Sequence, residues 1–230
     1  MDRLPEPELM NDPAQAHAYA HADFAEPHQR FVSLFAEEFP TLEVRGRVLD
    51  LGCGAADVTL RFARAFPHCA IDAVDGAEPM LKHARTLIAH AGMQTRIHLL
   101  HQCLPTTQLA PHRYDAVISN SLLHHLHDPN VLWNAIKTCA RDGAAIFVLD
   151  LLRPASIETA RALVEQHARD EPDILKRDFF NSLLAAFRPG EIRSQLQQCG
   201  LRHLRVRAVS DRHVLISGIF QAGNYQGNTD

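Results

Sequence analysis

A glycine-containing turn between an apolar run and a helix-type pattern narrows the range of possible folds more than any other segment of this chain. The apolar run Val48–Leu51 leads into Gly52 and Gly54, and helical spacing of apolar residues begins at Val58. Glycines allow positive φ and carry no Cβ, so the backbone of such a turn can pass close to a ligand. The pattern therefore predicts a buried parallel strand, a ligand-binding loop and a helix, in that order.

A second apolar stretch ends in an acid. Ala70–Val74 is followed by Asp75, roughly 20 residues after the loop, and a carboxylate in that position usually accepts from both hydroxyls of a ribose. A dinucleotide-binding loop is one alternative, but it needs a third glycine where this chain has Asp57, and an acid at a helix start repels a pyrophosphate. Asp50 before the loop and Asp57 at its end instead favour a ligand that carries a positive charge.

This combination of an acid, two glycines and an acid-tipped second strand resembles the class I S-adenosylmethionine-dependent methyltransferases of the small-molecule type. The resemblance spans about residues 45 to 152. It implies a Rossmann-like α/β fold, with a doubly wound seven-stranded sheet that ends in a C-terminal antiparallel hairpin. It also implies S-adenosyl-L-methionine as cofactor and S-adenosyl-L-homocysteine as product, with the glycine loop under the methionine part and Asp75 on the ribose.

Three later strands match the same family in order: residues 96–100, 114–121 and 144–151, the last preceded by a turn at 141–143. The family often has Asp where Gln102 stands, although the Gln102 amide oxygen can still accept from an adenine amino group. The end of the fourth strand should face the sulfonium. The cofactor-binding residues implied by the resemblance are Tyr19, Asp50, Gly52, Cys53, Gly54, Asp57, Asp75, Gly76, Met80, Gln102, Cys103, Leu104, Ser119, Asn120 and Ser121.

The chain is predicted to divide into an N-terminal arm and helical lid (residues 1–40) and a methyltransferase domain (residues 41–230). Residues 1–12 should be a loose arm, and Asp12 followed by Pro13 predicts a helix start. In similar methyltransferases an N-terminal helix covers the cofactor, and a Tyr there can touch its carboxylate. Tyr19 either has that role or is a packed aromatic residue, and His28 is a weaker site residue.

Within 41–230, residues 154–188 read as two helices inserted after the fifth strand, where they would cover the substrate side of the sheet. Their aromatic side chains either pack in a core or line a pocket for a small, partly apolar acceptor. Residues 201–209 and 214–220 predict the terminal hairpin, and the polar tail from Gln221 is predicted to be disordered.

The candidate catalytic residues are His124, His125, Asp150 and Arg153. Either histidine can take a proton near neutral pH, and Arg153 can bind a carboxylate or phosphate with two hydrogen bonds. The ordinary alternative is a local ion pair between Asp150 and Arg153. Asp211 and His213 are less certain candidates for the mouth of the site.

The histidine-rich segment suggests a metal site as a further hypothesis. On a helix, His124 would share a face with His127 or Asp128, and such a pair can bind Zn²⁺ or a similar ion. A second dense cluster of ligands does not accompany it in the sequence, so we expect no metal.

Composition limits the class of partner. The net charge is −4 without a run dense in Lys and Arg, which argues against nucleic acid, and no apolar run is long enough for a membrane span. Five cysteines without C-x-x-C spacing fit reduced thiols, so a cytoplasmic location is expected. The sequence predicts a small-molecule methyl acceptor and gives no oligomeric state. The alternatives are a non-catalytic partner subunit, another alkyl transfer with the same cofactor, and a nicotinamide oxidoreductase.

Overall fold

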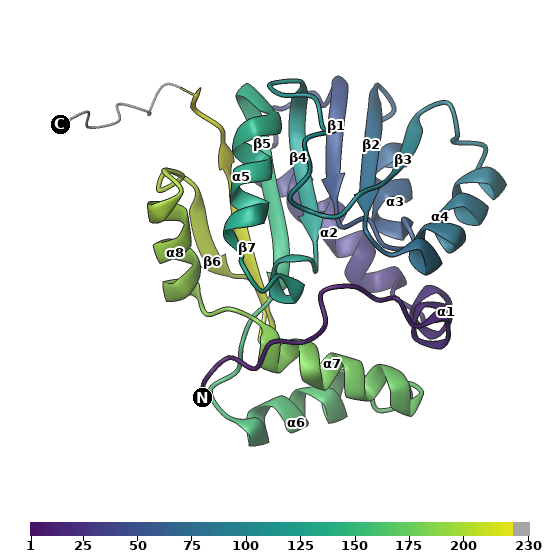
Figure 1. The fold of residues 1–230 in the computed structure, drawn as a ribbon, viewed down its shortest axis with the longest axis vertical. Coiled ribbons are helices and arrows are strands. Elements are labelled where there is room, and N and C mark those ends of the chain that lie inside the picture. Colours follow the sequence, from purple (N-terminus) through teal and green to yellow (C-terminus); the bar gives the residue numbers. More distant parts are fainter. Residues whose placement is uncertain (223–230) are drawn as a thin grey trace.

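Seven strands form one mixed sheet in the order β3-β2-β1-β4-β5-β7-β6, and the computed structural model describes residues 1–222 (Figure 1). Neighbours among β1 to β5 are parallel, whereas β7 runs antiparallel to both β5 and β6. The predicted doubly wound sheet with a terminal hairpin inserted beside the fifth strand is confirmed. The strands are β1 (Gly46–Leu51), β2 (Cys69–Asp75), β3 (Ile97–His101), β4 (Tyr114–Asn120), β5 (Ala140–Leu151), β6 (Arg205–Ala208) and β7 (His213–Ile219).

Helices cover both faces of the sheet. The helices are α1 (Pro13–His21), α2 (Ala25–Glu38), α3 (Asp57–Ala65), α4 (Glu78–His90), the 3₁₀ turn η1 (Leu123–His125), α5 (Asn130–Cys139), α6 (Ile157–His167), α7 (Asp173–Ala185) and α8 (Pro189–Gln198). Helices α2, α3 and α4 bury their apolar sides on one face, and α5 and α8 do so on the other. Both faces of the parallel strands are therefore buried, as their continuous apolar runs require.

The order of the strands reverses between β1 and β4, which creates a crevice at the carboxyl ends of these strands. Figure 1 shows α1, α6, α7 and the N-terminal segment gathered beside this end of the sheet. Asp12 caps α1 by accepting from Ala14 N at 2.7 Å, and Ser156 caps α6 by accepting from Thr159 N at 3.2 Å. The predicted helix start at Pro13 and the two predicted cap helices are thus confirmed.

The fifth strand begins earlier than predicted. β5 starts at Ala140 and includes residues 141–143, which the sequence suggested as a turn. Ala140 pairs with Tyr114, the pairing shifts before Ala116, and Gly143 has a φ of +80°. A glycine with positive φ inside a strand is typical of a β-bulge. The residues that suggested a turn therefore form an irregularity within β5. The prediction for the tail from Gln221 onward falls almost wholly outside the described residues.

The N-terminal arm is fixed in place, which corrects the prediction of a loose segment. Arg3 donates to the carbonyls of Ala185 (2.6 Å), His124 (2.7 Å) and Leu126 (2.9 Å). Its guanidinium also lies 4.0 Å from the centre of the Phe187 ring. One planar group with five donors can satisfy carbonyls at a helix end and a loop together, so a single residue anchors an otherwise irregular segment.

Helix α2 belongs to the main core rather than to a lid. Phe31 and Phe35 are fully buried, and Phe35 packs edge-on against Phe62 at 4.9 Å and Phe147 at 5.4 Å between ring centres. Of the predicted lid, residues 1–12 and α1 lie along the crevice, and α2 also reaches it through His28 and Arg30. Within residues 1–222, no helix combines the length and the apolar character needed to span a bilayer.

Candidate functional site

The glycine loop joins β1 to α3 and forms one wall of a large cavity. Gly52 and Cys53 both donate to the Val74 carbonyl, at 2.8 and 3.0 Å, which holds the loop against the end of β2. Gly52 and Gly54 have φ of +75° and +54°, a backbone region that other residues rarely adopt. A Cβ on Gly52 would lie 2.8 Å from Leu122 Cβ. The predicted close approach of backbone to a ligand therefore has a physical basis in these glycines.

Changing Gly52 to alanine should lower affinity for S-adenosylhomocysteine, because the new methyl group must displace Leu122 from the cavity wall. Gly92 is a matched control, since its φ is +65° and a Cβ there meets nothing within 4 Å. Both variants should lose about 1–2 kcal/mol of stability through left-handed backbone strain, but only Gly52→Ala should weaken binding in a calorimetric titration. Equal affinities in the two variants would contradict this role for the loop.

Asp75 lies at the end of β2 and organises the loop. Its Oδ2 accepts from Gly54 N and its Oδ1 accepts from Ala77 N, both at 2.8 Å. Burial raises the pKa of Asp75, and the backbone hydrogen bonds offset only part of that effect. An ionised carboxylate has about four lone-pair sites, so acceptor capacity remains toward the cavity that Asp75 lines.

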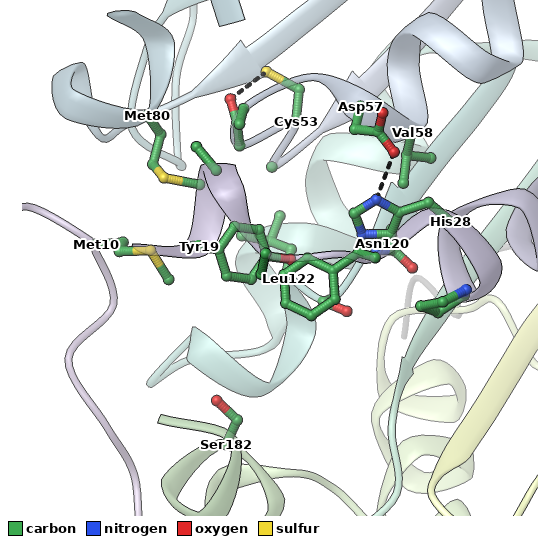
Figure 2. A pocket seen from close by; sticks show the side chains of 18 of the residues that line it. Met10, Tyr19, His28, Cys53, Asp57, Val58, Met80, Asn120, Leu122 and Ser182 are labelled. Atoms are coloured by element: carbon green, nitrogen blue, oxygen red, sulfur yellow. Dashed lines mark hydrogen bonds and ion pairs between the residues drawn. The ribbon is translucent and has the colours of Figure 1, made fainter. Parts of the chain in front are cut away.

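The two acids that flank the loop differ in environment. Asp50 is buried and accepts from Thr59 Oγ1 at 2.6 Å, and burial raises its pKa to about 7. Asp57 Oδ2 lies 2.7 Å from His28 Nδ1 (Figure 2) and accepts from Arg61 Nε, also at 2.7 Å. Burial alone would raise the pKa of Asp57, but these two partners outweigh it and lower that pKa. Asp50 therefore remains an acid that a bound cation would stabilise, whereas the charge of Asp57 is already compensated.

The segment after β3 forms another part of the wall. Gln102, Cys103 and Leu104 all line the cavity. The Gln102 side chain is engaged within its own loop: its amide nitrogen donates to Gln108 at 2.6 Å and its oxygen accepts from Thr106 at 3.2 Å. Binding through the Gln102 side chain would thus require these hydrogen bonds to be shared.

Gly76 lies between this segment and the N-terminal arm. A Cβ on Gly76 would come within 2.8 Å of both Cys103 Sγ and Leu9 Cδ2. The arm therefore reaches the same part of the cavity as the loop after β3.

Helix α1 places Tyr19 beside the predicted cofactor side of the cavity. Tyr19 packs on Phe24 with ring centres 4.8 Å apart, and Figure 2 shows it next to Met10 and Met80. Burial, with Asp57 and Asp75 nearby, raises the pKa of Tyr19 to about 12, so the phenol keeps its proton. Tyr19 and Met80 both line the cavity, and their contact with the cofactor stays a prediction.

The end of β4 separates into one structural residue and two that reach the cavity. Asn120 and Ser121 line it, but Ser119 is fully buried and donates to the Leu51 carbonyl at 2.7 Å. Ser119 therefore ties β4 to β1, and its prediction as a cofactor contact does not match its position.

Asp150 and His124 form a buried pair next to the cavity. The Asp150 carboxylate accepts from His124 Nδ1 at 2.6 Å and from Leu123 N and Leu151 N at 2.7 Å. Burial opposes charge on the His124 ring, but Asp150 and Glu6 outweigh it, so the pKa of His124 is raised. The hydrogen bond from Nδ1 to Asp150 fixes the ring, so His124 can present Nε2 to a partner on the Glu6 side. Asp150 lies behind His124 and does not line the cavity.

His125 and His213 line the cavity as neutral rings. Burial, with His124 alongside, lowers the pKa of His125 to about 3. Burial and the adjacent Arg212 lower the pKa of His213 to about 4. Asp211 instead pairs with His167 at 2.9 Å and with Arg212 at 2.9 Å.

Arg153 is not at the mouth of the cavity, which corrects its prediction as a substrate clamp. Its buried guanidinium forms an ion pair with Glu191 and donates to the Ala186 carbonyl at 3.3 Å. The suggested local pair with Asp150 is also wrong, because each of the two has a different partner. Arg153 fastens the segment after β5 to the start of α8.

Glu6 is a site residue that sequence reasoning missed. Its Oε1 accepts from Ser182 Oγ at 2.9 Å and lies 3.3 Å from His125 Nδ1 and 3.6 Å from His124 Nε2. The arm carries no periodic pattern, and its contacts are more than 100 residues away in sequence. A local signal for this placement is therefore absent from residues 1–12.

The cavity has a volume of about 1360 Å³. Its walls are the glycine loop and the ends of β2 and β4 on one side, and the arm, α1 and α7 on the other. In Figure 2, Ser182 of α7 faces the space across from Tyr19 and Met80. Among the predicted residues, the fold brings together those of the loop, β2, α1 and η1, but not Ser119, Asp150 and Arg153.

Comparisons with known proteins agree with this geometry. Residues 48–143 match the family model described as a methyltransferase domain. An uncharacterized methyltransferase of Mycobacterium tuberculosis is 33% identical over 108 residues, which cover 47% of this chain and 52% of that protein. The match thus spans about half of that relative's length.

A ubiquinone biosynthesis O-methyltransferase of Bordetella avium is 28% identical over 187 residues, covering 80% of this chain and 71% of that protein. The crystal structure of a SAM-dependent methyltransferase from Aquifex aeolicus superposes with a TM-score of 0.66 at 16% identity, covering 90% of this chain and 98% of that one. With the strand order, the glycine loop and the acid at the end of β2, these matches lead to one conclusion: the chain contains a methyltransferase domain, and its fold is that of the class I S-adenosylmethionine-dependent methyltransferases.

Proposed function

We propose that this protein transfers a methyl group from S-adenosylmethionine to a small-molecule acceptor bound in the same cavity. One observation carries the proposal: the cavity of about 1360 Å³ is continuous from the glycine loop to the arm and α7. Pockets for a single drug-sized ligand are about 300–1,000 Å³. The space therefore suits a cofactor and a second small molecule side by side.

The residues at one end of the cavity fit the cofactor. Gly52 and Gly54 leave room for close approach, and Asp75 offers acceptor capacity for a ribose diol. Burial raises the pKa of Asp50 to about 7. A cation bound nearby would favour the ionised form of this acid. A bound S-adenosylmethionine supplies a positively charged sulfur and a methyl group that is already activated for transfer. The chain's task is to align an acceptor and exclude water.

The other end of the cavity favours a small acceptor. The arm is held over it by three hydrogen bonds from Arg3, and α7 closes it with Ser182 and Phe179. A polynucleotide would have to displace this cover, and the chain's net charge of −4 gives it little attraction for phosphates. We infer that the arm, α1 and the inserted helices enclose the reaction, and that this enclosure sets which acceptors enter.

A screen of methyl acceptors tests the proposal. Purified full-length protein is incubated with S-adenosylmethionine and sets of phenols, thiols, amines and carboxylates, and S-adenosylhomocysteine is measured as the product. At least one small-molecule class should give turnover that Asp75→Ala reduces, while added total RNA should gain no methyl groups. Tight S-adenosylhomocysteine binding without turnover on any small acceptor would favour a non-catalytic partner subunit, and methylation of RNA would contradict the proposed acceptor class.

A further inference from the structure

Three side chains of metal-ligating type meet at the acceptor end of the cavity. Glu6 comes from the arm, and His124 and His125 come from η1. Each offers one ligand atom, and these atoms all lie within 4.8 Å of one another. The sequence pattern pairs His124 with His127 or Asp128 and does not indicate Glu6 as a partner.

We propose that Glu6, His124 and His125 bind one divalent metal ion of the zinc type, with a further position open to an oxygen atom of the acceptor. The part that concerns the acceptor rests on the proposed function. The metal site itself does not, because it is defined by side chains that are in place without any acceptor.

The distances from the Glu6 ligand atom to the two histidine ligand atoms suit a tetrahedral ion. Glu6 Oε1 lies 3.3 Å from His125 Nδ1 and 3.6 Å from His124 Nε2. Zinc–nitrogen and zinc–oxygen bonds of about 2.0–2.2 Å at tetrahedral angles place ligand atoms about 3.3–3.6 Å apart. An ion can therefore enter with side-chain adjustments of a few tenths of an ångström at these two edges of the site.

Neighbouring groups hold the ligands in the required orientation. Asp150 accepts from Nδ1 of His124 at 2.6 Å, which fixes the ring and turns Nε2 toward Glu6. Ser182 donates to Glu6 Oε1 at 2.9 Å, and Arg3 binds the His124 carbonyl at 2.7 Å. A carboxylate on the far nitrogen of a ligating histidine is the usual support at zinc sites.

The fourth position faces the cavity, since Glu6, His124 and His125 all line it. Two histidines and one carboxylate are a ligand set that leaves a position for water or substrate in catalytic zinc sites. An ion held by these three ligands would lower the pKa of a hydroxyl group bound at the open position. An alcohol or a phenol is therefore the acceptor class that this site would serve. The ordinary reading is that Glu6 only holds the arm closed through the two histidines, and the experiment below separates the two.

Metal uptake by the full-length chain provides the test. Chelator-treated protein is titrated with Co²⁺ and followed by its visible absorption, and zinc content is measured by mass spectrometry after dialysis against Zn²⁺. The wild type should bind one ion per chain and show the absorption of four-coordinate Co²⁺. Loss of a group that only supports a metal ligand weakens metal binding about 10- to 100-fold. Glu6→Gln and His125→Asn remove a ligand itself, so each should weaken metal binding at least about 100-fold.

Glu8→Gln and His127→Asn are the matched controls. They change the same residue types on the same two segments, where Glu8 accepts from His127 N at 2.7 Å and His127 Nε2 contacts the Glu6 carbonyl at 2.9 Å. Both should retain stoichiometric binding. Absence of stoichiometric uptake by the wild type, or equal uptake by Glu6→Gln and His125→Asn, would overturn the proposal and leave Glu6 as an arm anchor.

Two further readouts keep this proposal separate from the proposed function. S-adenosylhomocysteine affinity should be the same in Glu6→Gln as in the wild type, because the ligand set lies at the acceptor end. Full turnover by metal-free protein would refute the ion's role in binding the acceptor while the methyl-transfer function stands. Stoichiometric metal binding in a protein that methylates no small acceptor would support the site and refute that function.

Discussion

Asp75→Ala should weaken binding of S-adenosylhomocysteine by about 10- to 150-fold, which corresponds to about 1.5–3 kcal/mol for a lost hydrogen bond to a charged group. Asp75 combines two tasks, since its oxygens accept from Gly54 N and Ala77 N at 2.8 Å and it also lines the cavity. Removing the carboxylate deprives the ligand of its ribose contact and leaves two backbone donors of the loop without their acceptor. Isothermal titration of the wild type and the variant measures the effect.

Glu78→Gln is the control for this variant. Glu78 lies three positions further along the chain, is half exposed and pairs with Arg85 at 2.6 Å, so its loss removes a nearby negative charge without touching the loop. Affinity should change less than twofold, because exposed ion pairs contribute little. If Asp75→Ala binds as well as Glu78→Gln does, Asp75 is not the ribose-binding acid.

Asp150→Ala should lower the free energy of unfolding by about 3–5 kcal/mol, because it removes one partner of a buried pair and leaves buried hydrogen-bond donors without their acceptor. Asp150 is 1% exposed, and its carboxylate satisfies the amides of Leu123 and Leu151 as well as His124 Nδ1. The loss therefore affects both the end of β5 and η1. Urea denaturation in the presence of a chelator measures the protein's own contribution, free of any bound ion.

Glu165→Ala provides the comparison for Asp150→Ala. Glu165 of α6 forms an exposed pair with Arg169, two residues beyond the end of this helix, and the two side chains are 66% and 69% exposed. Its removal should change the free energy of unfolding by no more than about 0.5 kcal/mol. A similar small cost for Asp150→Ala would mean that the buried pair with His124 is not a significant part of the fold's stability.

The parts of the site that could be predicted are those encoded locally. Gly52, Gly54 and Asp75 each follow an apolar run, and the carboxyl ends of parallel strands meet at one edge of a sheet. The cap at Asp12 can be predicted in the same way, because a cap depends on only three or four consecutive residues. These features required no knowledge of distant contacts.

Ser119 and Arg153 are two residues whose roles could not be predicted from local sequence. Both faces of a central parallel strand are buried, so the apolar run around Ser119 does not reveal which side chains point toward the crevice. Arg153 was placed at the mouth because it follows β5, but its partner Glu191 is 38 residues away and belongs to α8. A charged residue near a strand end can serve the fold as readily as the ligand, and only its tertiary partners distinguish the two.

Glu6 shows the same limit at longer range. Its contact with Ser182 joins residues 176 positions apart, and the arm that carries it has neither periodic pattern nor regular structure. The arm is instead fixed by side-chain donors on backbone carbonyls, chiefly those of Arg3. Backbone carbonyls are present at every residue, so a sequence contains no mark of which ones will be bound.

A crystal structure of the chain grown with S-adenosylhomocysteine would show whether the glycine loop and Asp75 bind the cofactor. We predict the amino acid part of the ligand over Gly52 and Gly54 and its ribose hydroxyls within hydrogen-bond distance of Asp75. A ligand bound away from the carboxyl ends of β1 and β2, or a complex in which Asp75 makes no contact with the ribose, would contradict the account.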